Sequence, residues 1–140
     1  MPGSSLWLIP PPHSSLYSTL NTLINTTIPA TIPPSTKTTT QPPPHFSPHV
    51  TLTADTVTPS DDPQQWLDRL SLPETAKDLR VQMKEPQVGE IFFRKLTLRC
   101  EKNDGLKALA GACRRAGTGE GSAEVEDWVE GVYAPHLSLL

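Results

Sequence analysis

The stretch at residues 48–56, PHVTLTADT, begins with a regular alternation of side-chain types. Val50 and Leu52 are apolar, whereas His49 and Thr51 carry an imidazole and a hydroxyl group. Because successive side chains of a β-strand point to opposite faces of the sheet, the alternation predicts a strand with one apolar and one polar face. His49 and Thr51 should project together from the polar face, while Val50 and Leu52 pack behind them.

A second copy of this pattern lies near the other end of the sequence. Residues 135–139 read PHLSL, so both copies have the form proline, histidine, aliphatic residue, hydroxyl residue, leucine. The remaining histidines, His13 and His45, lack this context. His136 and Ser138 should share one face of their own strand. An internal repeat of this kind predicts a two-fold site in which the two motif strands lie side by side.

Two such strands would present two imidazoles and two hydroxyl groups to one cleft. The ordinary pKa of histidine is about 6.5, so one ring can accept a proton and the other can donate one at neutral pH. Two hydroxyl groups can donate hydrogen bonds to the oxygens of a phosphate held between the rings. The motifs therefore predict His49 and His136 as an acid–base pair and Thr51 and Ser138 as phosphate-binding residues. This chemistry needs no metal and no other cofactor.

Other interpretations of these residues stay open. A histidine on a strand with one polar face is more often a packed or solvated residue than a catalytic one, so either motif alone could be purely structural. A zinc site at His45 and His49 would need one helical turn between them, which Pro44 and Pro48 disfavour. The aromatic residues of largest area are expected in the core rather than as stacking platforms: Trp7, Trp66 and Trp128.

Composition divides the chain into a first third rich in proline, serine and threonine and a more ordinary remainder. Of 140 residues, 16 are proline, and Lys37 is the only charged residue up to Ala54. Residues 25–44 lack periodicity, so we expect a disordered insertion within a single domain of residues 1–140. The net charge of −3 argues against a stable nucleic-acid complex. No apolar run approaches the roughly 18 residues of a membrane span. The apolar residues 6–9 form a run far shorter than the core of a signal peptide, with no Lys or Arg before it and three prolines after it.

Apolar periodicity elsewhere predicts the remaining elements. In chain order we expect a strand, a helix, a strand, a helix, a two-stranded hairpin, two helices and a last strand, which is a mixed α/β or α+β domain. Cys100 and Cys113 fall at apolar positions and should be buried, reduced thiols. The expected segments are a buried strand at 5–9, a helix from Ser14 or Ser15, a strand at 46–54, a helix from Asp61–Pro63, a hairpin of 79–83 with 91–100 that turns at Glu85–Pro86, a helix capped by Asp104, a loop at Gly117–Gly121, a helix at 125–132 and a strand at 136–140.

Four stretches of the sequence resemble the fungal 2′,3′-cyclic-nucleotide 3′-phosphodiesterases, a branch of the two-histidine phosphoesterase superfamily. They are SLWLIPPP at 5–12, PHVTLTADT at 48–56, FFRKLTLRCEK at 92–102 and WVEGVYAPHLSLL at 128–140. The resemblance implies a bilobal α+β fold with antiparallel sheets, in which each motif lies on a central strand and the cleft lies between the lobes. It also implies metal-free hydrolysis of ribose 2′,3′-cyclic phosphates to 2′-phosphates. Activity on ADP-ribose 1″,2″-cyclic phosphate, a by-product of tRNA splicing, would fit the same resemblance.

Carried over to this sequence, the resemblance makes His49 and His136 the acid–base pair and Thr51 and Ser138 the phosphate donors. One histidine would deprotonate water for in-line attack on phosphorus, and the other would protonate the departing 3′ oxygen. We favour His136 as the base and His49 as the acid, although the sequence does not separate the two roles. The partner would be a small cyclic phosphate, and the protein a monomer without a membrane span.

Further expectations concern the extent, compartment and alternative functions of the chain. Family members continue past the second motif, so we expect a chain truncated at Leu140 with an incomplete second lobe. The lack of a targeting signal makes the cytoplasm the default compartment, and the resemblance allows association with the Golgi. The alternatives to an active enzyme are a catalytically dead fragment that binds a nucleotide and a protein that serves only in interactions.

Overall fold

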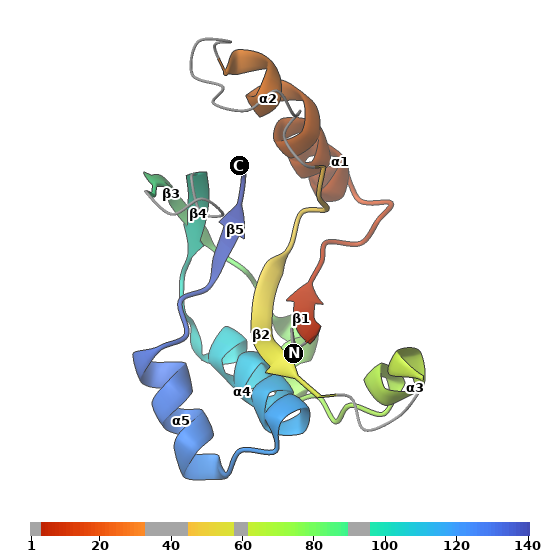
Figure 1. Cartoon of the computed structure of the whole chain (residues 1–140), viewed down its shortest axis with the longest axis vertical. Coiled ribbons are helices and arrows are strands. Elements are labelled where there is room, and N and C mark those ends of the chain that lie inside the picture. The colour runs from red at the N-terminus through yellow and green to blue at the C-terminus, as the bar shows by residue number, and fades with distance from the viewer. Residues whose placement is uncertain (1–3, 33–44, 58–61, 90–95) are drawn as a thin grey trace.

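The computed structural model describes residues 4–32, 45–57, 62–89 and 96–140. Its centre is an antiparallel sheet with the strand order β1-β2-β5-β4-β3 (Figure 1). The last strand lies between the second and the fourth, so the two motif strands are neighbours, as the repeat predicts. The bounds of the strands are β1 Ser4–Leu8, β2 Val50–Thr56, β3 Met83–Val88, β4 Leu96–Cys100 and β5 His136–Ser138.

Helices occupy the connections between the strands. Helix α4 packs against β2, and α5 packs against α4 (Figure 1). The succession of helices and strands follows the predicted order, and the α+β class is confirmed. The bounds are α1 Ser15–Thr22, the π-helix η1 Leu23–Thr27, α2 Ile28–Thr31, α3 Pro63–Asp68, the 3-10 helix η3 Glu74–Asp78, α4 Asp104–Thr118 and α5 Ser122–Gly131.

Polar side chains set the start of three helices. The Ser14 hydroxyl accepts a hydrogen bond from the backbone N–H of the third residue after it and begins α1, as predicted. The Asp62 carboxylate accepts two backbone N–H groups at 3.0 and 3.2 Å and begins α3. Helix α4 begins one residue earlier than predicted, because Asn103 rather than Asp104 provides the cap.

The core lies on one face of the sheet. The aliphatic residues of both motifs contribute Val50, Leu52, Leu137 and Leu139 to it, and the apolar stripe of α4 belongs to the same cluster and packs against β2. Complete burial of one such side chain contributes about 1.5–3 kcal/mol relative to its exposed state, so this face fixes which way each motif strand turns. The buried members of the core are Leu20, Ile24, Val50, Leu52, Cys100, Leu106, Leu109, Ala110, Cys113, Tyr133, Leu137 and Leu139.

The prediction of a disordered insertion at 25–44 is wrong for residues 25–32, which continue the first helix through η1 and α2. The Asn25 amide donates to the carbonyl oxygen of Phe46 at 2.9 Å and accepts from the N–H of the same residue at 3.0 Å. Ile24 is buried, and Ile28 packs against the core. These contacts join the helix to the chain just before β2 and offset the entropy lost on ordering. Residues 33–44 lie outside the described residues.

Both edge strands differ from expectation. Strand β1 is not buried: Leu6 and Leu8 pack against the core, but Trp7 lies on the opposite, uncovered face. In the hairpin, Glu85–Pro86 does not form the turn, because both residues lie inside β3. Proline is tolerated there because β3 is an edge strand. The predicted strand residues 91–95 lie outside the described part of the chain.

Candidate active site

The two motifs meet where β2 and β5 pair. The strands run antiparallel, and the aliphatic residues that follow the two histidines lie opposite each other. In an antiparallel ladder the flanking residues are then also opposite each other, so His49 faces Ser138 across the strands and Thr51 faces His136. All four residues belong to the face of the sheet that turns away from the core. Each of the four is partly exposed.

This register places the two histidines on one diagonal of a four-residue square and the two hydroxyl residues on the other. Residues that lie directly opposite each other have Cβ atoms about 4.5–5.5 Å apart, and diagonal neighbours are about 7–8 Å apart. A group of the size of a phosphate, held above the centre of the square, can be approached by all four side chains.

Each imidazole is oriented by the backbone of its own motif. Nδ1 of His49 lies 2.7 Å from the carbonyl oxygen of Ser47, and Nδ1 of His136 lies 2.9 Å from that of Ala134. A carbonyl oxygen only accepts hydrogen bonds, so each Nδ1 donates its proton to the chain two residues upstream. Nε2 of each ring is therefore the nitrogen left to exchange protons with a ligand. The two motifs share a side-chain orientation as well as a sequence pattern.

Trp7 lies beside this square on β1, opposite Thr51. Its ring stacks on the His49 ring, with centroids 3.8 Å apart and planes inclined by 12°, while 46% of Trp7 stays exposed. The Phe46 ring approaches His49 edge-on, with centroids 6.5 Å apart. The expectation that Trp7 is a core residue is therefore wrong. Its place between the inward-facing Leu6 and Leu8 is the sequence pattern that could have put it on the site face.

Two residues of β4 extend the same face on the other side of β5. Arg99 lies opposite His136, and Thr97 lies opposite Ser138. Sequence reasoning assigned neither of them to the site. The alternation that correctly turns Leu96, Leu98 and Cys100 toward the core also turns these two residues away from it.

A buried tyrosine holds the two motif strands together from behind. The Tyr133 hydroxyl donates to the carbonyl oxygen of Thr51 at 3.2 Å, which links the segment that leads into β5 to the start of β2. Burial raises the pKa of this hydroxyl, so it stays a donor at every physiological pH. Cys100 and Cys113 are free and buried, as predicted. Burial raises the pKa of Cys113 to about 11, so that thiol is not a nucleophile at neutral pH.

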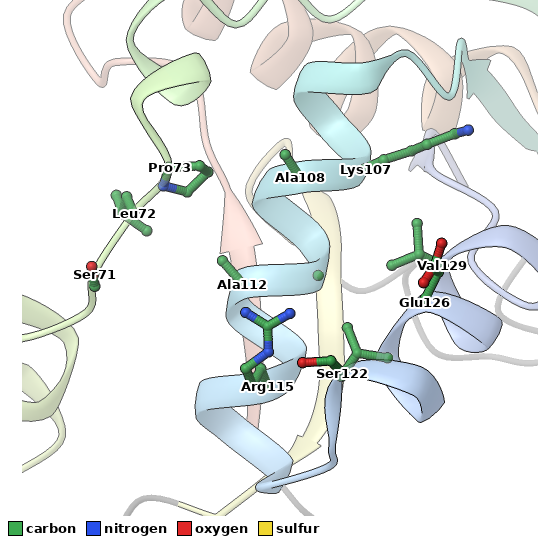
Figure 2. Close-up of a pocket in the computed structure, with 12 residues that line it drawn as sticks. Ser71, Leu72, Pro73, Lys107, Ala108, Ala112, Arg115, Ser122, Glu126 and Val129 are labelled. Carbon is green, nitrogen blue, oxygen red and sulfur yellow. The ribbon is translucent and has the colours of Figure 1, made fainter.

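Two cavities border these elements. One of about 470 Å³ opens beside His136, and its lining includes Thr97 and Arg99. The other, of about 560 Å³, lies between α4, α5 and residues 71–73 (Figure 2). None of the four motif side chains lines this larger cavity, so its size does not make it the candidate site.

Neither a metal-binding cluster nor a membrane-spanning helix is found in the described ranges, residues 4–32, 45–57, 62–89 and 96–140. Within them, no three or more histidine, cysteine, aspartate or glutamate side chains are grouped so that they could hold a metal ion. The helices of those ranges include none with the length and apolar character needed to cross a membrane.

The family profile and the two relatives that match this chain indicate the same family. A family profile described as "Cyclic phosphodiesterase-like protein" matches residues 1–140. The 2′,3′-cyclic-nucleotide 3′-phosphodiesterase of Phaeosphaeria nodorum is 41% identical over 143 residues, an alignment that covers 100% of this chain and 69% of the fungal protein. The protein of the same name from Neurospora crassa is 35% identical over 152 residues, covering 100% of this chain and 71% of that protein. No solved structure matches the chain significantly.

Proposed function

Because the chain belongs to the cyclic phosphodiesterase-like family, we propose that it hydrolyses nucleoside 2′,3′-cyclic phosphates to 2′-phosphates. The observation that carries the proposal is the register of β2 and β5, which puts two histidine–hydroxyl pairs on one uncovered face. The names of both fungal relatives describe this reaction. The same four side chains would meet the five-membered cyclic phosphate of ADP-ribose 1″,2″-cyclic phosphate, so we extend the proposal to this product of tRNA splicing.

In the proposed reaction the cyclic phosphate lies above the centre of the square. Thr51 and Ser138 donate their hydroxyl protons to its non-bridging oxygens, where one donor facing a developing charge is worth up to about 3–4 kcal/mol. Nε2 of His136 takes a proton from water as the water oxygen bonds to phosphorus. Nε2 of His49 gives a proton to the 3′ oxygen as its bond to phosphorus breaks. Proton exchange with solvent then returns both rings to their starting states.

The surroundings of the two rings favour this division of roles. The Trp7 face gives a positively charged ring at His49 a cation–π contact, which suits the general acid. Among the described residues, His136 has no such aromatic ring contact, which leaves it the role of base.

The proposal predicts the product and the metal requirement of the reaction. Incubation of the chain with adenosine 2′,3′-cyclic phosphate should yield adenosine 2′-phosphate, with the same rate in EDTA as in its absence. The rate should follow a bell-shaped pH profile, because one ring must be neutral and the other charged. Chromatography against authentic 2′- and 3′-phosphates identifies the product. A 3′-phosphate would reverse the assigned leaving group, loss of activity in EDTA would overturn the metal-free mechanism, and binding without turnover would favour a nucleotide-binding protein.

A further inference from the structure

We propose that Arg99 binds a second phosphate group of the substrate, one that does not react. The inference rests on the proposed function and assigns a residue to the recognition of substrates that carry another phosphate on the same ribose, such as a 5′-phosphate or the diphosphate of ADP-ribose 1″,2″-cyclic phosphate. It is based on the position of Arg99 in the sheet, on the charges around the neighbouring cavity and on the absence, within the described residues, of a hydrogen-bond or ion-pair partner for the guanidinium.

The sheet register places Arg99 beside the reacting centre and not within it. The phosphate that reacts would lie between β2 and β5, whereas Arg99 is on β4, on the far side of His136. Neighbouring strands are about 4.8 Å apart, so the long Arg99 side chain extends over the surface next to the square. Arg99 is exposed, and its backbone belongs to a strand that pairs on both sides, which fixes where the side chain starts.

The 470 Å³ cavity extends from His136 in this same direction. Residues of β3, β4 and the segment before β5 line it, and no residue of β1 or β2 does. The cavity therefore offers room for a group attached to the reacting phosphate on the β4 side, away from Trp7.

The charged residues that line this cavity within the described part of the chain are all positive. Lys84, Arg99 and Lys102 contribute cations, and no described aspartate or glutamate is in the lining. Lys102 is already engaged, because its Nζ donates to three backbone carbonyl oxygens at 2.6, 2.9 and 3.0 Å near the end of α5. Glu85 follows Lys84 on β3, yet within the described ranges no ion pair joins it to either free cation. Among the described residues, Arg99 and Lys84 thus give this cavity a positive field, which a phosphate would neutralise.

The experiment measures binding and therefore does not depend on turnover. Titration calorimetry at low salt compares adenosine 2′-phosphate with adenosine 2′,5′-bisphosphate. The second phosphate should tighten binding about 5- to 10-fold, as expected for one charge-assisted contact at a partly exposed site. The advantage should shrink as salt is raised. In the Arg99→Gln variant it should fall to about twofold or less, and Arg99→Lys should restore part of it.

The matched control is Arg115→Gln, which removes one positive charge from α4 at the other cavity. This variant should keep the full preference for the bisphosphate over the monophosphate. An equal affinity of the wild-type protein for both ligands would overturn the inference. An equal loss of affinity for both ligands in Arg99→Gln would also overturn the inference, because Arg99 would then contact the reacting phosphate. If the preference is present but no cyclic phosphate is hydrolysed, the anion site stands and the proposed catalysis fails. If neither ligand binds, both fail.

Discussion

Replacement of His49 or His136 by alanine should each lower the rate of cyclic phosphate hydrolysis at least about 100-fold, the low end for a group that transfers a proton in the transition state. The expectation follows from their place on one diagonal of the square and from the carbonyl bonds that leave Nε2 of each ring for proton transfer. Thr51→Ala and Ser138→Ala should cost less than either histidine variant, because each removes a single neutral donor.

The matched control for these variants is His45→Ala. His45 is exposed and lies only four residues before His49, but it is outside both motifs. Its replacement should leave the rate unchanged. The variant that lacks both motif histidines should be hardly slower than the single variants, because residues that act as a unit are not additive. Wild-type rates in both single variants of an active protein would refute the assignment of the acid–base pair.

Replacement of Gly117 by alanine should lower the free energy of unfolding by about 1–3 kcal/mol, the usual range for overpacking. A Cβ atom at this position would lie 2.3 Å from Cγ2 and 2.9 Å from Cβ of Thr56. Thr56 is buried and its hydroxyl donates to the carbonyl oxygen of Ser4 at 2.9 Å, so the side chain cannot rotate away without losing that bond. The carbonyl of Gly117 also accepts the N–H of Val57 at 2.8 Å, which holds α4 close to the end of β2.

The control for this prediction is Gly111→Ala in the same helix. There a Cβ would make only ordinary contacts, 3.5 Å from Val125 and Val129, so the stability should be unchanged or higher by up to about 1 kcal/mol of helix propensity. Thr56→Ser, which removes Cγ2 and keeps the hydroxyl, should relieve part of the cost of Gly117→Ala. Urea unfolding measures the free energy of unfolding of all three variants, and the comparison holds when the slope of that free energy against urea concentration is unchanged. Equal stability of Gly117→Ala and Gly111→Ala would contradict the close approach of α4 to β2.

The alternation of side chains was sufficient to predict both motif strands and the face that each motif residue occupies. It correctly predicted that Val50, Leu52 and Leu137 face the core, because burial of apolar side chains dominates the orientation of a strand that is covered on one side. The pairing of β2 with β5 could only be hypothesised from the repeat, since register between distant strands depends on contacts that no local pattern contains.

Tertiary contacts explain what sequence reasoning missed. Residues 25–32 are rich in threonine and contain a proline, yet Ile28 continues the spacing of four from Leu20 and Ile24 and packs against the core. The hydrogen bonds of Asn25 with Phe46 also hold the segment as a helix. Gly117 was expected in a loop because glycines cluster there, but it lies within α4, where its lack of a side chain admits Thr56. Trp7 was expected in the core because large aromatic residues usually are buried, whereas the polar face of β1 turns it toward His49.

The most direct test of the central claim, that both histidines serve one phosphate, is an experimental structure with a nucleoside 2′-phosphate bound. We predict that Nε2 of His49 and Nε2 of His136 each lie within about 3.2 Å of an oxygen of the same phosphate, with the Thr51 and Ser138 hydroxyls on its other oxygens. A phosphate held by only one of the rings, or Nε2 atoms more than roughly 10 Å apart, would contradict the claim, because a proton donor and a proton acceptor must both reach the reacting group.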